Sequence, residues 1–287
     1  VNVADVGHRH SVSAFGFALG YLGGGLLFAL NVAMLLTPQT FGLADTSMAV
    51  RLAFLMVAVW WAIFSIPLIV WVREPSRGNR LSGWASATAA WQQLRETFRK
   101  VRTLRVVALF LAAYWLYIDG VGTIIRMAID YGMSIGLEPK SLMVALLITQ
   151  FVGFPAALVF GKIGTRYGAK TGIFLGLAAY IGVAIWGFFM QREAEFYVLA
   201  IVIGCVQGGV QALSRSLYSR LIPQHQAAEF FGFYNMLGKF AAVVGPVLMG
   251  WVGMATGNPR YGILSIIGLF VAGGVLLFWV DDAETHP

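Results

Sequence analysis

The chain has 287 residues, of which 59% are hydrophobic and only 11% are charged, and its formal net charge is +7. A soluble domain carries about 25% charged residues, so this composition excludes an ordinary soluble protein and indicates an integral membrane protein. No stretch has the composition of a soluble domain with a basic face, so the positive charge does not indicate nucleic-acid binding.

Eight apolar segments follow one another along the chain, and each approaches the roughly 20 residues that a helix needs to cross a bilayer. Hydrocarbon offers no water to unpaired backbone groups, so only helices and closed barrels span it. The segments are continuously apolar and about twice as long as barrel strands, which also alternate in polarity. We therefore predict an all-α membrane protein with spans near residues 12–36, 50–72, 105–127, 140–162, 171–190, 196–218, 230–254 and 260–280.

The first span carries small residues and one deep polar side chain. Gly16, Gly20 and Gly24 are spaced by four residues, a pattern that lets two helix backbones approach closely. Fixed packing and a sliding contact both explain the pattern, and the sequence does not decide between them. Asn31 is the polar side chain placed deepest in this span, so it is a candidate pathway residue.

The longest connection covers residues 73–104 and contains a predicted amphipathic helix. Its apolar positions recur every three or four residues, at Trp84, Ala87, Trp91, Leu94, Phe98 and Val101. Basic residues occupy much of the remaining surface, which is typical of a helix lying at a membrane interface. We favour a solvated linker helix, with a lipid sensor or calmodulin-type target as the alternative.

The third span contains charged residues, and placing their charge in apolar surroundings costs free energy. A buried carboxylate near the membrane centre costs about 2.5–3.5 kcal/mol on insertion scales, so Asp119 should face a cavity or a partner helix. It would bind substrate or a proton, or serve as a structural hydrogen-bond partner. Arg126 shares the face of Asp119, and its i, i+4 spacing from Asp130 predicts an interfacial ion pair.

Uncharged polar residues mark two further spans. Gln207, Gln211 and Ser214 fall on one face of the sixth span, and Gln150 lies in the fourth. Amide side chains both donate and accept hydrogen bonds, so they suit a zwitterionic solute. They also suit hydrogen bonding between helices, and this alternative stays open. Arg215 follows this face near the end of the span, where an anchoring role is the simpler interpretation.

The seventh span contains Asn235 and Lys239 at i, i+4 spacing. Lys239 lies about 13 Å inside the predicted boundary of this span. Its ammonium group either snorkels outward, or pairs with a solute carboxylate or with Asp119. Proline removes a helix hydrogen bond, so Pro155 and the pair Gly245-Pro246 predict bends in the fourth and seventh spans.

Lys and Arg gather in alternate connections. Most of them lie in the N-terminal segment with Arg9, the connection 73–105, the turn 162–170 and the stretch 215–229. Cytosolic loops carry the excess of Lys and Arg, so these segments and both termini are expected in the cytosol.

The turn after the fourth span reads "GKIGTRYGAK", residues Gly161 to Lys170. Gly161, Arg166, Gly168 and Lys170 match the cytosolic loop motif of major facilitator transporters, which this turn resembles. Thr165 stands where that family usually has Asp, so the charge contact of that Asp with a neighbouring helix is not expected here. A phosphate loop is excluded, because its pattern needs Gly directly before Lys and a preceding strand.

Four longer stretches narrow the resemblance. They read "SAFGFALGYLGGG", "YWLYIDGVGTI", "QGGVQALSRSLYSRLIP" and "FFGFYNMLGKFAAVVGP". Together they resemble the family of the autophagy-related vacuolar amino-acid effluxer and its bacterial relatives, within the major facilitator superfamily. The resemblance implies that residues 1–72 are the last two helices of a first six-helix half. Residues 73–104 would be the linker and residues 105–287 a complete second half, with the first four helices missing from this chain.

The resemblance also implies a function. We expect a secondary transporter that exports small solutes, amino acids among them, by alternating access around a central site. Its partners would be the solute, a proton, the lipid bilayer and the missing N-terminal helices, and its location a bacterial inner membrane. A membrane-embedded structural or receptor-like protein is the alternative. An enzyme is least favoured, because no His–Glu metal pattern or nucleophile elbow occurs; no metal or cofactor site is predicted.

Overall fold

The computed structural model describes residues 9–71 and 83–281, and every regular element in these residues is helical. The predicted all-α class is therefore confirmed. Within the described ranges, eight helical segments are long and apolar enough to cross a membrane. The elements are α1 (Arg9–Leu36), η2 (Pro38–Phe41), α2 (Thr46–Trp71), α3 (Gly83–Thr103), α4 (Arg105–Ser134), α5 (Pro139–Tyr167), α6 (Ala169–Phe189), α7 (Glu193–Leu221), η3 (Gln224–Gln226), α8 (Ala227–Phe240), α9 (Val244–Thr256), α10 (Pro259–Ser265) and α11 (Ile267–Phe278).

The contacts divide the chain into two compact units. The larger unit comprises residues 1–22 and 95–287, and the smaller unit comprises residues 23–94. In the smaller unit, Met34, Leu43 and Ala49 form a small buried cluster. The division runs inside α1 and α3, so it differs from the three segments that the sequence suggests, and that three-part division stays a prediction.

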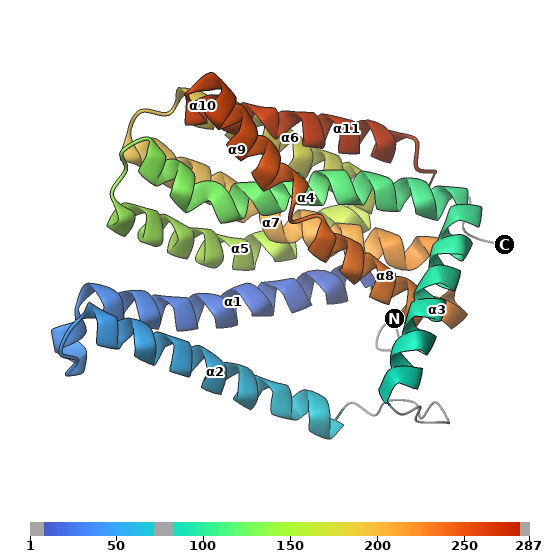
Figure 1. The fold of residues 1–287 in the computed structure, drawn as a ribbon, viewed down its shortest axis with the longest axis horizontal. Helices are drawn as coiled ribbons and strands as arrows, with labels where there is room; N and C mark the ends of the chain where they lie inside the picture. Colours follow the sequence, from blue (N-terminus) through green and yellow to red (C-terminus); the bar gives the residue numbers. More distant parts are fainter. Residues whose placement is uncertain (1–8, 72–82, 282–287) are drawn as a thin grey trace. The chain divides into compact units, whose positions relative to one another are not determined.

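The larger unit is a bundle of long helices (Figure 1). Helices α5 and α6 both pack along α7, and α11 packs along α4. Glycines allow these close approaches: a Cβ at Gly204 would lie 2.9 Å from the carbonyl oxygen of Thr149, and one at Gly273 would lie 2.9 Å from the amide nitrogen of Tyr117. Small residues at such contacts let backbones pack closely without a hydrophobic driving force from water. At Gly16 and Gly20, an added Cβ would meet nothing within 4 Å, so the close packing predicted there is not present within the described chain.

The predicted seventh span is broken into α8 and α9. Helix α8 ends at Phe240 and α9 begins at Val244. Pro246 explains the break, because it lacks an N–H and its ring would clash with the carbonyl of Ala242 in a continuous helix. The bend predicted at Gly245-Pro246 is thus a full interruption. Helix α5, in contrast, runs through Pro155 without interruption.

The last turns of the linker helix α3 dock on the start of α8. Val101 and Thr97 are buried, and the rings of Phe98 and Phe233 lie 6.3 Å apart. Thr97 donates a hydrogen bond to the Glu229 carboxylate, which also pairs with Lys100 at 3.3 Å.

The amphipathic linker helix is confirmed over Gly83–Thr103, and its place at the membrane interface stays a prediction. Residues 73–82 of the linker, and the side chains of Trp84 and Ala87, lie outside what the structure describes.

Candidate functional site

Asp119 lies at the break between α8 and α9. Its side chain is 2% exposed, and its Oδ2 accepts a hydrogen bond of 2.9 Å from the backbone N–H of Gly245, in the first turn of α9. The first N–H groups of a helix have no partner inside the helix, so this carboxylate satisfies one that the break sets free. The expectation that Asp119 faces a cavity or a partner helix is confirmed for the partner helix.

The second oxygen of Asp119 and the hydroxyl of Thr123 are both buried beside Gly245. Both atoms are buried and have no hydrogen-bond partner within the described part of the chain. A Cβ added at Gly245 would lie 3.2 Å from Asp119 Oδ1 and would also contact Thr123 Oγ1. The Thr123 hydroxyl thus occupies the position that a side chain at Gly245 would fill, close to the Asp119 carboxylate, and a proton on Asp119 would have an acceptor nearby in Thr123.

Arg126 does not form the ion pair that its spacing predicts. Lys100 pairs with Glu229, but no such contact joins Arg126 and Asp130, so the Arg126–Asp130 prediction is wrong. The guanidinium instead folds back over Gly122, where an added Cβ would lie 2.9 Å from Arg126 Nη2. Helical side chains lean toward the N-terminus, and the missing side chain at Gly122 lets Arg126 turn toward Asp119.

A cavity of about 50 Å³ lies inside the larger unit. Side chains of α4, α5, α6, α7, α9 and α10 line it, and most are apolar. Gln207 and Thr149 are its main polar members; Gln207 Oε1 is buried without a hydrogen-bond partner in residues 9–71 and 83–281. Thr149 Oγ1 donates to the carbonyls of Ala145 and Ala200, so its hydrogen bonding is satisfied. Asp119 does not line this cavity.

The other predicted residues lie at separate places on the larger unit. Ser214 is buried, its Oγ lies 2.7 Å from the hydroxyl of Tyr117, and it donates to the carbonyl of Val210. Gln150 and Gln211 are half-buried, whereas Asn235 and Lys239 are exposed on α8. Asn31 belongs to the smaller unit, where it is buried with Oδ1 unpaired within the described chain. The roles given to these residues stay predictions.

The residues that match the loop motif form the turn between α5 and α6. Gly168 has φ +87°, a conformation that glycine adopts readily. Lys170 Nζ donates to the carbonyls of Phe278 and Val280, and so holds the start of α6 against the end of α11. Thr165 Oγ1 donates to the carbonyl of Gly161 in its own helix at 2.9 Å, so it does not replace the charge contact of an Asp at this position.

Sequence reasoning missed an aromatic wall between α4, α7 and α8. The ring of Tyr234 stacks between Tyr114, with centroids 4.2 Å apart, and Tyr218, 4.8 Å away. Phe110 extends the stack 5.7 Å beyond Tyr218. Arg215 lies over the adjacent Phe231 ring. The available signal was the recurrence of Phe110, Tyr114 and Tyr117 along one face of α4.

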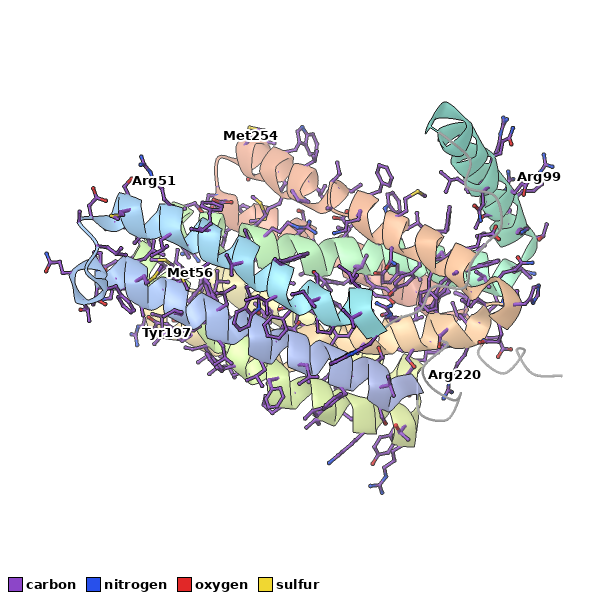
Figure 2. The ribbon with its side chains drawn as sticks, turned by 90° about the horizontal axis from the view of Figure 1, so that it is seen from below. Arg51, Met56, Arg99, Tyr197, Arg220 and Met254 are labelled. Atoms are coloured by element: carbon purple, nitrogen blue, oxygen red, sulfur yellow. The ribbon has the colours of Figure 1, made fainter. Side chains whose placement is uncertain are left out.

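Figure 2 labels residues that mark the two ends of the larger unit. Arg99 and Arg220 lie at one end, and Tyr197 and Met254 lie at the other. The end with the two arginines is the end that the distribution of Lys and Arg assigns to the cytosol. The orientation itself stays a prediction.

Comparison with known proteins identifies the family. A family model described as "Vacuole effluxer Atg22 like" matches residues 2–286. The chain belongs to this family. It is 38% identical over 283 residues to the uncharacterized MFS-type transporter YxiO of Bacillus subtilis, covering 98% of the chain and 66% of that relative. It is 30% identical over 313 residues to autophagy-related protein 22 of Yarrowia lipolytica, covering 97% of the chain and 52% of that relative.

Family membership confirms the resemblance seen in the motifs. The chain is a multi-pass membrane protein with an all-α fold of the major facilitator kind, and its relatives are transporters, so the expectation that it is not an enzyme is confirmed. The chain spans about two thirds of the length of the bacterial relative and about half of that of the fungal one.

Proposed function

We propose that this chain is part of a secondary transporter that exports small solutes, amino acids among them, by alternating access. The names of its relatives support transport, since one is called an MFS-type transporter and the family is described as a vacuole effluxer. The bacterial relative favours a bacterial inner membrane. A structural or receptor-like membrane protein has no comparable support.

One observation carries the proposal: a membrane-spanning segment is interrupted at Ala241–Val243, and the buried Asp119 bonds to the free N–H that follows. Interrupted helices with polar groups at their free ends are characteristic of sites in secondary transporters. A carboxylate inside a membrane is costly and normally marks a pathway or a proton relay. Asp119 would then couple protonation to movement of α9 against α8.

The remaining polar groups support a site in the same unit. Gln207 offers an unpaired amide oxygen to the cavity, and Arg126 lies over Gly122, on the side of the helix turn that leads toward Asp119. Asn235 and Lys239 are exposed on α8. The solute would contact these groups in turn as two halves of the complete protein rock around it.

Efflux from proteoliposomes tests the proposal. The protein from the complete reading frame would be reconstituted into liposomes. These would be loaded with a mixture of radiolabelled amino acids, and a pH gradient would be imposed across the membrane. We expect export faster than from protein-free liposomes, and a dependence on the gradient. Flux equal to that of protein-free liposomes, for amino acids and for other small solutes alike, would contradict transport.

A further inference from the structure

We propose that Arg215 is the centre of a binding site for an oxyanion, either a carboxylate or a phosphate group, formed by α4, α7 and α8. The sequence suggests only an anchoring role for this arginine, and the structure gives it a more specific setting. Assigning the oxyanion to a transported solute rests on the proposed function. The chemistry of the site depends only on the contacts of Arg215 with its neighbours.

The Arg215 guanidinium is held over an aromatic ring, but no carboxylate in the described part of the chain pairs with its charge. It lies 5.5 Å from the centroid of the Phe231 ring. A cation over an aromatic face is held electrostatically, yet none of its five N–H donors is used by that contact. Arg215 is exposed, and no carboxylate of the described residues lies within ion-pair distance of it.

Arg215 lies near the end of α7, where packing holds the backbone in place. Six residues separate it from the end of α7 at Leu221, which corresponds to about 9 Å along a helix. Its neighbour Ser214 is buried and hydrogen-bonded to Tyr117 of α4, so the backbone here is fixed by packing. The guanidinium of an arginine near a helix end reaches the membrane interface, so Arg215 is available to a ligand there.

Stacked tyrosine rings, whose hydroxyl groups are polar, lie next to the Phe231 ring that holds the guanidinium. The Phe231 ring beneath Arg215 lies 6.0 Å from the ring of Tyr234, which stacks on Tyr114. These rings are stacked at 4.2 Å and almost fully buried, so they cannot move away from a ligand easily. The Tyr114 hydroxyl lies 3.2 Å from the position of a Cβ at Gly238. Gly238 is on α8, beside Lys239.

This arrangement suits an oxyanion better than other ligands. The planar guanidinium fork matches the two oxygens of a carboxylate or phosphate. Asn235 and Lys239 lie on the next turns of α8 after Phe231, and both are exposed, so a second cation and an amide are available along the same helix. The oxyanion has two sources, a free solute or the headgroup of a lipid in the cytosolic leaflet.

Chemical modification of arginine tests the proposal without measuring transport. The purified protein in phosphatidylcholine nanodiscs would be treated with phenylglyoxal, and the modification rate of each arginine would be measured by mass spectrometry. Acetate or inorganic phosphate would replace chloride at constant ionic strength. Arg102 is the matched control, because it is also exposed and lies 6.0 Å from the centroid of the Phe98 ring.

We expect acetate or phosphate to slow modification of Arg215 by about tenfold, the effect of one occupied strong site, and to leave Arg102 unchanged. Protection by the soluble anions assigns the site to a solute. Protection that appears only in nanodiscs containing phosphatidylglycerol supports the oxyanion site and assigns it to a lipid headgroup. Equal rates for Arg215 in all conditions, or no modification of Arg215 at all, would overturn the proposal.

Two variants test the anion site by its effect on thermal stability, and a comparison of protection with transport separates this proposal from the proposed function. Arg215→Gln should lose the thermal stabilisation that the protecting anion gives, and Arg215→Lys should retain part of it, because lysine keeps the charge without the fork. Protected Arg215 in a protein that moves no solute would leave the site standing and reject transport. Active transport with an unprotected Arg215 would reject the site and leave transport standing.

Discussion

The Asp119 carboxylate accepts a hydrogen bond of 2.9 Å from the backbone N–H of Gly245, which joins the middle of α4 to the first turn of α9. The bond bridges residues 126 positions apart, at the point where a spanning segment loses its own backbone hydrogen bonds. A side-chain acceptor replaces a backbone carbonyl here, because an unpaired backbone N–H in a buried setting costs free energy. This contact therefore combines a structural task with an ionisable group.

Removing the acceptor should destabilise the protein, whereas removing the charge alone should not. Asp119→Ala leaves the Gly245 N–H unpaired, which costs about 1–3 kcal/mol of unfolding free energy. Asp119→Asn keeps a carbonyl oxygen that can accept the same hydrogen bond. Thermal unfolding in detergent should show a lower Tm for the alanine variant and a nearly unchanged Tm for the asparagine variant. Equal Tm values for both variants and the parent would argue against this contact.

Close packing of α7 on α5 should make Gly204 intolerant of a side chain. Gly204→Ala would place a Cβ 2.9 Å from the Thr149 carbonyl oxygen, and the two backbones would have to separate. Such overpacking costs about 1–3 kcal/mol. Gly182→Ala is the matched control, because nothing lies within 4 Å of its Cβ position. The Tm of each variant decides the matter, and a Gly204→Ala protein as stable as the control would contradict the packing described.

Lys100 and Glu229 should act as a pair that fastens the linker helix to α8. Either single charge reversal, Lys100→Glu or Glu229→Lys, should increase proteolysis within α3, and the double reversal should restore protection. We expect a coupling free energy of about 0.5–1 kcal/mol, because Lys100 is partly exposed. Proteolysis rates of all four proteins give the double-mutant cycle. Additive effects of the two reversals would show that the residues do not interact.

The turn between α5 and α6 should depend on glycine at position 168. Its φ of +87° and ψ of 151° lie in a region that residues with a Cβ adopt only with strain, of order 1–3 kcal/mol. Gly168→Ala should therefore lower the Tm, although nothing lies within 4 Å of its Cβ position. Gly250→Ala is a fair comparison, since its surroundings are equally open and it lies inside α9. A Gly168→Ala protein with the Tm of the parent would show that the turn accepts a side chain.

The sequence predicts the number and approximate position of the spans because that information is local. Runs without charge, such as residues 171–190, correspond closely to helices such as α6, Ala169–Phe189. The interruption of the seventh span is also marked locally, by Gly245-Pro246. The interruption of the last span at Ile266 has no proline to mark it in the sequence. Ile266 is fully buried, so packing rather than local sequence accompanies that break.

The arrangement of the polar residues could not be predicted in the same way. Spacing alone places Arg126 within reach of Asp130 and of Asp119 alike, and the space above Gly122 directs it toward Asp119. The partner of Asp119 is 126 residues away, and no spacing rule connects it with Gly245. The setting of Arg215 depends on rings from three helices. These are tertiary contacts between distant segments, which a single sequence does not reveal.

In the proposed transport cycle Asp119 couples protons to solute movement, and efflux by the Asp119→Asn protein measures that coupling. The complete protein and this variant would be compared in proteoliposomes across a range of pH, with Tm measured on the same samples. We predict an unchanged Tm and a fall of about tenfold in gradient-driven efflux, within the usual range of coupling between two sites, together with loss of pH dependence. Full efflux with the pH dependence of the parent protein would contradict the claim.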